Sequence, residues 1–192
     1  MDRVSPLTRS RMMASIGSRH TKPEVLIRSA LFARGLRYRL HAKKLPGRPD
    51  LVLPKYRAVI QINGCFWHGH HCPLFKWPAS HQQFWRDKII GNMARDKANQ
   101  RAMDRLGWRV LVVWECALKG RNKMRMAELV DRIEQWLADA GGAMDIPCPA
   151  YCTLNHPHDC RQQQPYLYPK DVQIGTAGKW AKPQPPGPVG LE

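Results

Sequence analysis

Residues 64–72 constrain the fold of this chain more than any other stretch, because they crowd metal-binding groups into nine positions. Their sequence, GCFWHGHHC, holds two cysteines, three histidines and two adjacent aromatic residues. Two thiolates and an imidazole at this spacing suit tetrahedral Zn²⁺, which prefers sulfur and nitrogen ligands. A closed structural site needs a fourth ligand, and Cys116 follows the apolar run 110–114. The predicted zinc ligands are Cys65, His70, Cys72 and Cys116, with His71 as the alternative to His70.

A closed zinc site leaves three side chains of this stretch for other roles. His68 lies beside the ligands without being one, so it can titrate near neutral pH and act as a general base. Phe66 and Trp67 belong to the same loop of a strongly basic chain. Aromatic rings in such a setting stack on nucleic-acid bases or wedge between them.

Positive charge is concentrated in the first three quarters of the chain. The 192 residues include 31 lysines and arginines against 15 aspartates and glutamates, a formal net charge of +16. Residues 145–192 hold four of each sign, so residues 1–144 carry the whole excess. This charge indicates a polyanionic partner, nucleic acid above all, although a merely soluble basic protein would have the same composition.

The cellular compartment is predicted from what the sequence lacks. No apolar run approaches the ~18 residues of a membrane span. Residues 1–6 lack the apolar core that a secretion signal needs. The six cysteines are therefore expected in a reducing cytoplasm, where metal binding is favoured over disulfides.

Periodicity predicts an α/β domain with a small mixed sheet at its centre. A capping box at Thr21 and Glu24 opens a helix that Gly35 ends, which gives Glu24 a structural role on pattern alone. The other helices are expected at 6–17, 81–106 and 124–140, and the strands at 37–40, 51–53, 57–63 and 108–114. We expect an N-terminal DNA-contacting arm over 1–20, the main domain over 21–142 and a proline-rich extension over 143–192.

Asp50 stands at the mouth of a short apolar strand, directly after a proline. Metal-dependent nucleases often hold an aspartate there and further polar groups on the next strand, which together place Mg²⁺ against a scissile phosphate. In the broad P-D…(D/E)-x-K pattern an acid and a lysine would follow, but Gln61 and Asn63 occupy those positions. Either the site is inactive or another group, with His68 the first candidate, supplies the base. The structural alternative for Asp50 is a turn or capping residue.

The extension differs in composition from the rest of the chain. Nine of the 16 prolines lie in residues 145–192 and no apolar period continues there, which predicts partial disorder. Five side chains could form a second small metal site, with loose thiols and histidines as the alternative: Cys148, Cys152, His156, His158 and Cys160.

Several motifs, in this order, resemble the very-short-patch mismatch-repair endonucleases of bacteria. They are GRPD at 47–50, GCFWHxHxC at 64–72 and GWRV…WEC at 107–116. Residues 8–13, TRSRMM, and the pair Phe84-Trp85 also look like that family. The resemblance covers residues 5 to about 140 and leaves the tail outside.

This resemblance implies a restriction-endonuclease-like fold and a nick 5′ to the thymine of a T:G mismatch, left when 5-methylcytosine deaminates. It also implies catalytic Mg²⁺, structural Zn²⁺ and a monomer in the bacterial cytoplasm, with mismatch-repair proteins as further partners. Asp50 would ligate Mg²⁺ with the backbone carbonyl of Ile62, His68 would activate the attacking water, and Glu24 would support the site.

The family's DNA-contacting positions are also matched. Phe66, Trp67 and Trp85 would wedge into the duplex beside the mismatch, and Met13 would enter from the opposite groove. Lys88 and Asn92 match positions that approach the mismatched bases.

Two active-site positions depart from the family pattern. Ile62 stands where some relatives have threonine, which is harmless if only the carbonyl is used. Asn63 stands where histidine is common, and an amide cannot carry a proton, so this change bears on rate and pH dependence.

The competing interpretations are a restriction-type endonuclease of the same fold that cuts matched DNA and a non-catalytic zinc protein that binds DNA. A ββα-metal nuclease built on the histidine-rich loop ranks last, because it leaves Asp50 without a role.

Overall fold

In a computed structural model, residues 5, 7, 8, 11, 19–139 and 141–149 are described. Three α-helices and five strands, with two short 3₁₀ turns, make up this part of the chain. In chain order the elements are α2 (Lys22–Ala33), β1 (Arg39–Leu40), β2 (Leu51–Leu53), η1 (Pro54–Tyr56), β3 (Ala58–Asn63), α3 (Gln82–Arg105), β4 (Arg109–Trp114), η2 (Glu115–Ala117), α4 (Met126–Ala138) and β5 (Met144–Ile146). The predicted mixed α/β architecture is confirmed.

The strands form one sheet in the order β1-β2-β3-β4-β5. The pairs β1–β2 and β2–β3 are antiparallel, whereas β3–β4 and β4–β5 are parallel. The parallel pairing of β3 with β4 requires a crossover, and the 24-residue helix α3 provides it. Because β3 and β4 run parallel, the loops that follow Asn63 and Trp114 leave the same edge of the sheet.

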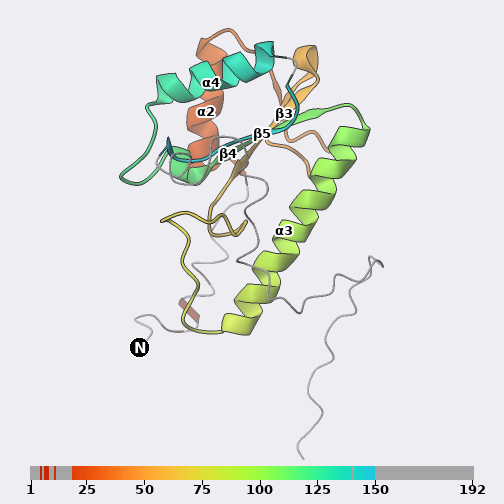
Figure 1. The fold of residues 1–192 in the computed structure, drawn as a ribbon. Coiled ribbons are helices and arrows are strands. Elements are labelled where there is room, and N and C mark those ends of the chain that lie inside the picture. Colours follow the sequence, from red (N-terminus) through yellow and green to blue (C-terminus); the bar gives the residue numbers. More distant parts are fainter. Residues whose placement is uncertain (1–4, 6, 9–10, 12–18, 140, 150–192) are drawn as a thin grey trace, which may run out of the picture. The chain divides into compact units, whose positions relative to one another are not determined.

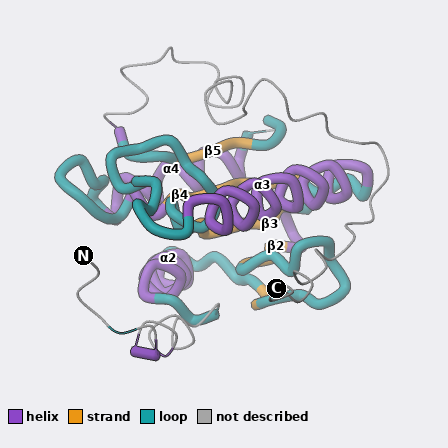
Figure 2. Tube along the Cα trace, turned by 90° about the horizontal axis from the view of Figure 1, so that it is seen from below, coloured by secondary structure: helices purple, strands orange, loops and turns teal. Residues whose placement is uncertain are grey.

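Side chains alternate between the two faces of the sheet, and each face has its own core. Leu51, Ile60 and Leu111 pack on one face with Ile27 of α2 and Ile133 of α4. Their strand neighbours, including Val52, Val59 and Val110, pack on the other face with Met103 of α3. The sheet therefore lies between α2 and α4 on one side and α3 on the other (Figure 1). Viewed at right angles, α3 runs along the strands that it covers (Figure 2).

The sheet continues past residue 142, where the extension was expected to begin. β5 pairs with β4 through the register Leu111↔Met144 to Val113↔Ile146. Its Ile146 is buried in the core with α2 and α4. The first residues of the expected extension thus belong to the sheet of the main domain, which a three-residue strand with only one buried residue did not reveal.

Several sequence-based expectations fall outside the described part of the chain. These are most of the helix expected at 6–17, Met13 within it, and Cys152, His156, His158 and Cys160 of the second metal site. Among the described helices, none combines the length and apolar character needed to cross a membrane.

Candidate active site and metal centre

Asp50 is placed by the β2–β3 hairpin. It directly precedes β2, and the antiparallel register sets it opposite the end of β3, where the Ile62 backbone N–H donates to Asp50 Oδ2 at 2.8 Å. Burial raises the pKa of the Asp50 carboxyl, an effect that the Ile62 hydrogen bond opposes and the nearby Glu24 charge reinforces. A carboxylate in this position is poised to accept a cation.

Glu24 serves the cap of α2 and also faces the site. The backbone N–H of Thr21 donates to its Oε2 at 3.3 Å, as a capping box requires. Its other oxygen, Oε1, faces Arg28 at 3.5 Å and His41 at 3.2 Å. The side chain is only 2% exposed. The structural and site roles of Glu24 are therefore compatible, because each uses a different carboxylate oxygen.

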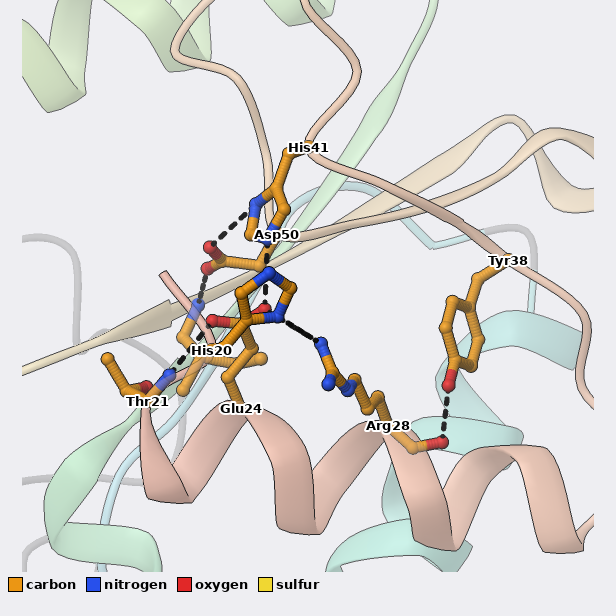
Figure 3. Close-up of polar contacts among 8 residues, drawn as sticks. His20, Thr21, Glu24, Arg28, Tyr38, His41 and Asp50 are labelled. Carbon is orange, nitrogen blue, oxygen red and sulfur yellow. Dashed lines mark hydrogen bonds and ion pairs between the residues drawn. The ribbon is translucent and has the colours of Figure 1, made fainter. Parts of the chain in front are cut away.

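His41 links the two carboxylates, a role that the sequence did not indicate. Its Nε2 lies 3.2 Å from Glu24 Oε1, and its Nδ1 lies 3.9 Å from Asp50 Oδ1 (Figure 3). The His41 backbone N–H donates to the Asp50 carbonyl at 3.3 Å, which extends the β1–β2 ladder by one rung. The strand expected at 37–40 ends one residue before His41. Pairing of that strand with 51–53 would have placed His41 opposite Asp50 and so indicated its position in the site.

His68 is paired with a carboxylate that the sequence analysis missed. Its Nδ1 lies 2.5 Å from Oδ2 of Asp96, which comes from α3. His68 is also close enough to Asp50 for its charge to lower that residue's pKa. Asp96 follows the buried Met93 by three positions and precedes the buried Met103 by seven. Its spacing from these buried residues could have indicated that Asp96 faces the domain, but α3 carries so many charged residues that this acid did not stand out.

Gly69 allows the loop to approach α3 closely enough for this pair to form. Its φ is +61°, and a Cβ there would lie 2.7 Å from Met93 Sδ and 2.9 Å from Ile89 Cγ2. Any larger residue would both strain the backbone and push the loop off the helix.

The remaining predicted catalytic positions lie at the end of β3. Ile62 provides the backbone contact to Asp50 already described, and its side chain packs against the core of α2 and α4. Asn63 is the last residue of the strand and is 9% exposed.

The three predicted wedge residues touch one another. The ring centroids of Phe66 and Trp67 are 5.2 Å apart, those of Phe66 and Trp85 are 5.2 Å apart, and those of Trp67 and Trp85 are 5.9 Å apart. Phe75 and Phe84 extend this aromatic cluster. Phe84 remains 61% exposed. The loop 64–72 and the start of α3 thus present one contiguous aromatic surface.

Asn92 and Lys88, the positions predicted to approach the mismatched bases, lie on α3 near this cluster. Asn92 Nδ2 donates to the Trp67 carbonyl at 2.8 Å, and Arg95 donates to Asn92 Oδ1 at 3.0 Å. Lys88 is exposed. Without DNA, Asn92 therefore holds the aromatic loop against α3.

The predicted zinc ligands meet at the edge of the sheet. One ligand atom from each of Cys65, His70, Cys72 and Cys116 lies within 4.8 Å of all the others. Cys116 Sγ and His70 Nδ1 are 3.6 Å apart, the separation of about 3.6 Å that tetrahedral zinc imposes on sulfur and nitrogen ligands. His70 stacks on Trp114 with centroids 4.1 Å apart, which fixes its ring. The exposed His71 does not belong to this group.

The thiols of this cluster lie close enough to shift one another's pKa. Cys116 donates to Cys65 and Cys72, which raises the pKa of Cys116 and lowers the pKa of Cys72. Cys148 is also buried there, and its backbone N–H lies 3.3 Å from Cys116 Sγ. Amide donation to a sulfur ligand is typical of the surroundings of metal-bound thiolates.

Comparison with known proteins supplies the family. Residues 1–74 match the family described as DNA mismatch endonuclease Vsr. The DNA mismatch endonuclease Vsr of Escherichia coli K12 is 47% identical over 139 residues, which cover 72% of this chain and 89% of that protein. Two type II nicking enzymes are also similar, V.XorIIP of Xanthomonas oryzae pv. oryzae and V.NmeAIP of Neisseria meningitidis serogroup A. They are 44% and 46% identical over 132 residues each, covering 68% and 69% of this chain and 97% and 93% of their own lengths. The family resemblance predicted from the sequence motifs is confirmed, and the chain belongs to the Vsr family of DNA mismatch endonucleases.

Proposed function

We propose that this protein nicks one strand of duplex DNA 5′ to the thymine of a T:G mismatch, in a Mg²⁺-dependent reaction. Family membership makes the chain an endodeoxyribonuclease that nicks DNA. The observation that carries the finer proposal is the convergence of Asp50, Glu24 and the His68–Asp96 pair beside an aromatic surface. A non-catalytic zinc protein would have no use for that convergence.

The residues around Asp50 fit a hard divalent cation. Asp50 Oδ2 is held by the Ile62 N–H, which orients the carboxylate, and the nearby Glu24 adds a second negative charge. Asp50 and the Ile62 carbonyl would supply oxygen ligands of the kind that Mg²⁺ prefers. Bound there, Mg²⁺ would act as a Lewis acid on the scissile phosphate.

His68 is proposed as the general base. If Asp96 accepts the Nδ1–H, it fixes the tautomer in which Nε2 carries the lone pair, and it stabilises the imidazolium formed when Nε2 takes a proton from water. This arrangement supplies a base although the chain lacks the lysine of the broad nuclease pattern and has asparagine at position 63, where histidine is common in the family.

Asp96→Asn should lower the single-turnover nicking rate by about 10²-fold or more, because an amide at this position no longer favours the productive tautomer or stabilises the imidazolium. Asp87→Asn is the matched control, since it makes the same charge change on α3 at an exposed residue bonded to Gln83. Equal nicking rates in both variants would show that Asp96 has no part in orienting His68.

The aromatic cluster is proposed to select the mismatch by inserting between stacked bases. Unstacking costs a few kcal/mol per step and is least unfavourable at a mismatch, so an enzyme that must wedge the duplex open discriminates against paired DNA. Phe66, Trp67 and Trp85 would enter the duplex, Lys88 would approach the bases, and Asn92 would do so after releasing Trp67. Met13 would act from the opposite groove.

Trp67→Ala should weaken binding to a T:G duplex by roughly 10- to 100-fold, the equivalent of about 1.4 to 2.8 kcal/mol of base stacking. Binding to a matched duplex should change much less, since that duplex is not opened. Titration of both duplexes at one fixed salt concentration measures the two changes. Equal weakening for both duplexes would mean that Trp67 contributes general affinity and not mismatch selection.

Further parts of the proposal follow from the family and the charge. The domain would adopt a restriction-endonuclease-like fold, act as a monomer on an asymmetric lesion in the bacterial cytoplasm, and cooperate with mismatch-repair proteins. Residues 1–20 would form a DNA-contacting arm, and Zn²⁺ would hold the loop 64–72 in shape.

Strand-specific labelling tests the proposed cut. A duplex with one T:G pair in a cytosine-methylation context is labelled in turn on each strand and incubated with protein and Mg²⁺. One product, cut 5′ to the mismatched thymine, is expected. Cutting of both strands of matched DNA would instead support a restriction-type enzyme.

A further inference from the structure

We propose that His20, Glu24 and His41 form a separate metal site, which binds an imidazole-preferring divalent transition ion such as Co²⁺ or Zn²⁺. One ligand atom from each residue lies within 4.8 Å of the others. This site shares no ligand with the cysteine cluster, and it lies beside Asp50 without including it. The proposal does not depend on the reaction proposed above.

The first observation in support is a buried nitrogen of His41 that lacks a hydrogen bond. Its Nε2 atom is buried and makes no hydrogen bond, although Glu24 Oε1 lies 3.2 Å away. A buried ring nitrogen without a hydrogen bond is unfavourable, because it has lost its bonds to water without replacement. An ion coordinated by Nε2 would remove that penalty, and Nδ1 would face the Asp50 carboxylate, as in the carboxylate–histidine–metal arrangement of many sites.

The second support is the placement of His20. Its ring meets the His41 ring edge to face, with centroids 5.3 Å apart. A guanidinium only donates, so His20 Nδ1 accepts from Arg28 Nη1 at 2.8 Å and Nε2 carries the proton. Nδ1 is therefore the nitrogen that an ion would take in place of Arg28. In Figure 3 the His20 imidazole lies between Arg28 and His41, above Glu24. Two imidazoles and one buried carboxylate favour a transition ion over Mg²⁺, which prefers an all-oxygen shell.

The charged groups around the cluster carry a net negative charge, which favours a cation. Glu24 and Asp50 contribute two negative charges, and Arg28 contributes one positive charge at 3.5 Å from Glu24 Oε1. An incoming ion would displace Arg28 from His20 Nδ1 and from its long contact with Glu24 Oε1. Arg28 therefore limits the affinity of the site, and its removal should raise that affinity.

The sequence motifs gave no indication of this site. Its three members come from the residue before the cap of α2, the first turn of α2 and the end of β1, and only the fold brings them together.

Cobalt titration of zinc-loaded protein provides the test. Zinc occupies the cysteine cluster, and Co²⁺ that displaced it would give strong sulfur-to-cobalt charge-transfer absorption. We expect calorimetry in the presence of excess Mg²⁺, which fills the site proposed at Asp50, to find one Co²⁺ site, together with weak visible bands that lack this absorption. Both His20→Gln and His41→Gln should weaken that site at least tenfold, whereas His81→Gln, at an exposed histidine outside both clusters, should not.

A fourth variant separates coordination from general damage. Arg28→Gln removes the competing positive charge and should strengthen Co²⁺ binding about three- to tenfold. The same Co²⁺ affinity in wild type, His20→Gln and His41→Gln would overturn the proposal. So would cobalt uptake that gives only the sulfur charge-transfer bands.

Discussion

Asp50→Asn is expected to reduce DNA nicking by about 10³-fold or more, because a neutral amide binds the proposed catalytic cation much more weakly than a carboxylate does. The substitution keeps the shape of the side chain and an oxygen that can accept the Ile62 N–H. Single-turnover rates on a mismatched duplex at saturating Mg²⁺ measure the effect. Asp104→Asn on α3 makes the same charge change at an exposed position and should nick at the normal rate.

Asp50→Asn should also be at least as stable as wild type when Mg²⁺ is absent. Burial raises the pKa of Asp50 above its unfolded value of 3.8, so the folded protein favours the neutral acid. The stabilising contribution of this group is present below pH 3.8 and is lost as the pH rises through the folded-state pKa. At neutral pH the buried charge is therefore destabilising, and asparagine removes it. A variant that unfolds more easily in urea and nicks at the wild-type rate would contradict both expectations.

Cys116→Ser is expected to release zinc and to lower the free energy of unfolding by several kcal/mol. Cys116 follows β4, and its thiol is the link that ties the loop 64–72 to the centre of the sheet. Because a structural zinc site contributes directly to folding, the loss of one ligand should loosen both the loop and the aromatic cluster on it. Metal analysis and urea denaturation of the purified variant measure the two effects.

Cys148→Ser is the matched control for this experiment. Cys148 is also buried beside Cys116, but it contacts the sulfur through its backbone N–H, which serine retains. This variant should keep one zinc per chain and most of its stability. Zinc retention in Cys116→Ser, or zinc loss in Cys148→Ser alone, would mean that the fourth ligand has been misassigned.

Sequence patterns predicted the elements of the fold well because most of them carry strong local signals. The run 110–114 is apolar throughout, as a strand buried on both faces must be, and α4 has a single apolar stripe. β5 lacks such a signal, since only Ile146 of its three residues is buried. Its place in the sheet is set by pairing with β4, which local sequence does not encode.

The site was predictable to the extent that its chemistry is compressed into short motifs. The loop 64–72 predicted a metal because it holds two cysteines and three histidines in nine residues, and the structure brings its predicted ligands together with Cys116. Asp50 was singled out by its place after a proline at the start of a strand together with that loop, and its catalytic role stays a prediction. His41 and Asp96 were missed because each is one charged residue among many in its own segment. Their roles appear only when β1, α2 and α3 are brought around the end of β3.

The ratio of single-turnover nicking rates on two duplexes tests the central claim most directly. The duplexes are identical except for one T:G or T:A pair, and both are incubated with wild-type protein and Mg²⁺. A nick 5′ to the mismatched thymine, with a rate at least 10²-fold above that on the T:A duplex, is the predicted result. Equal rates on the two duplexes would contradict the claim that this endonuclease selects a T:G mismatch by opening the base stack.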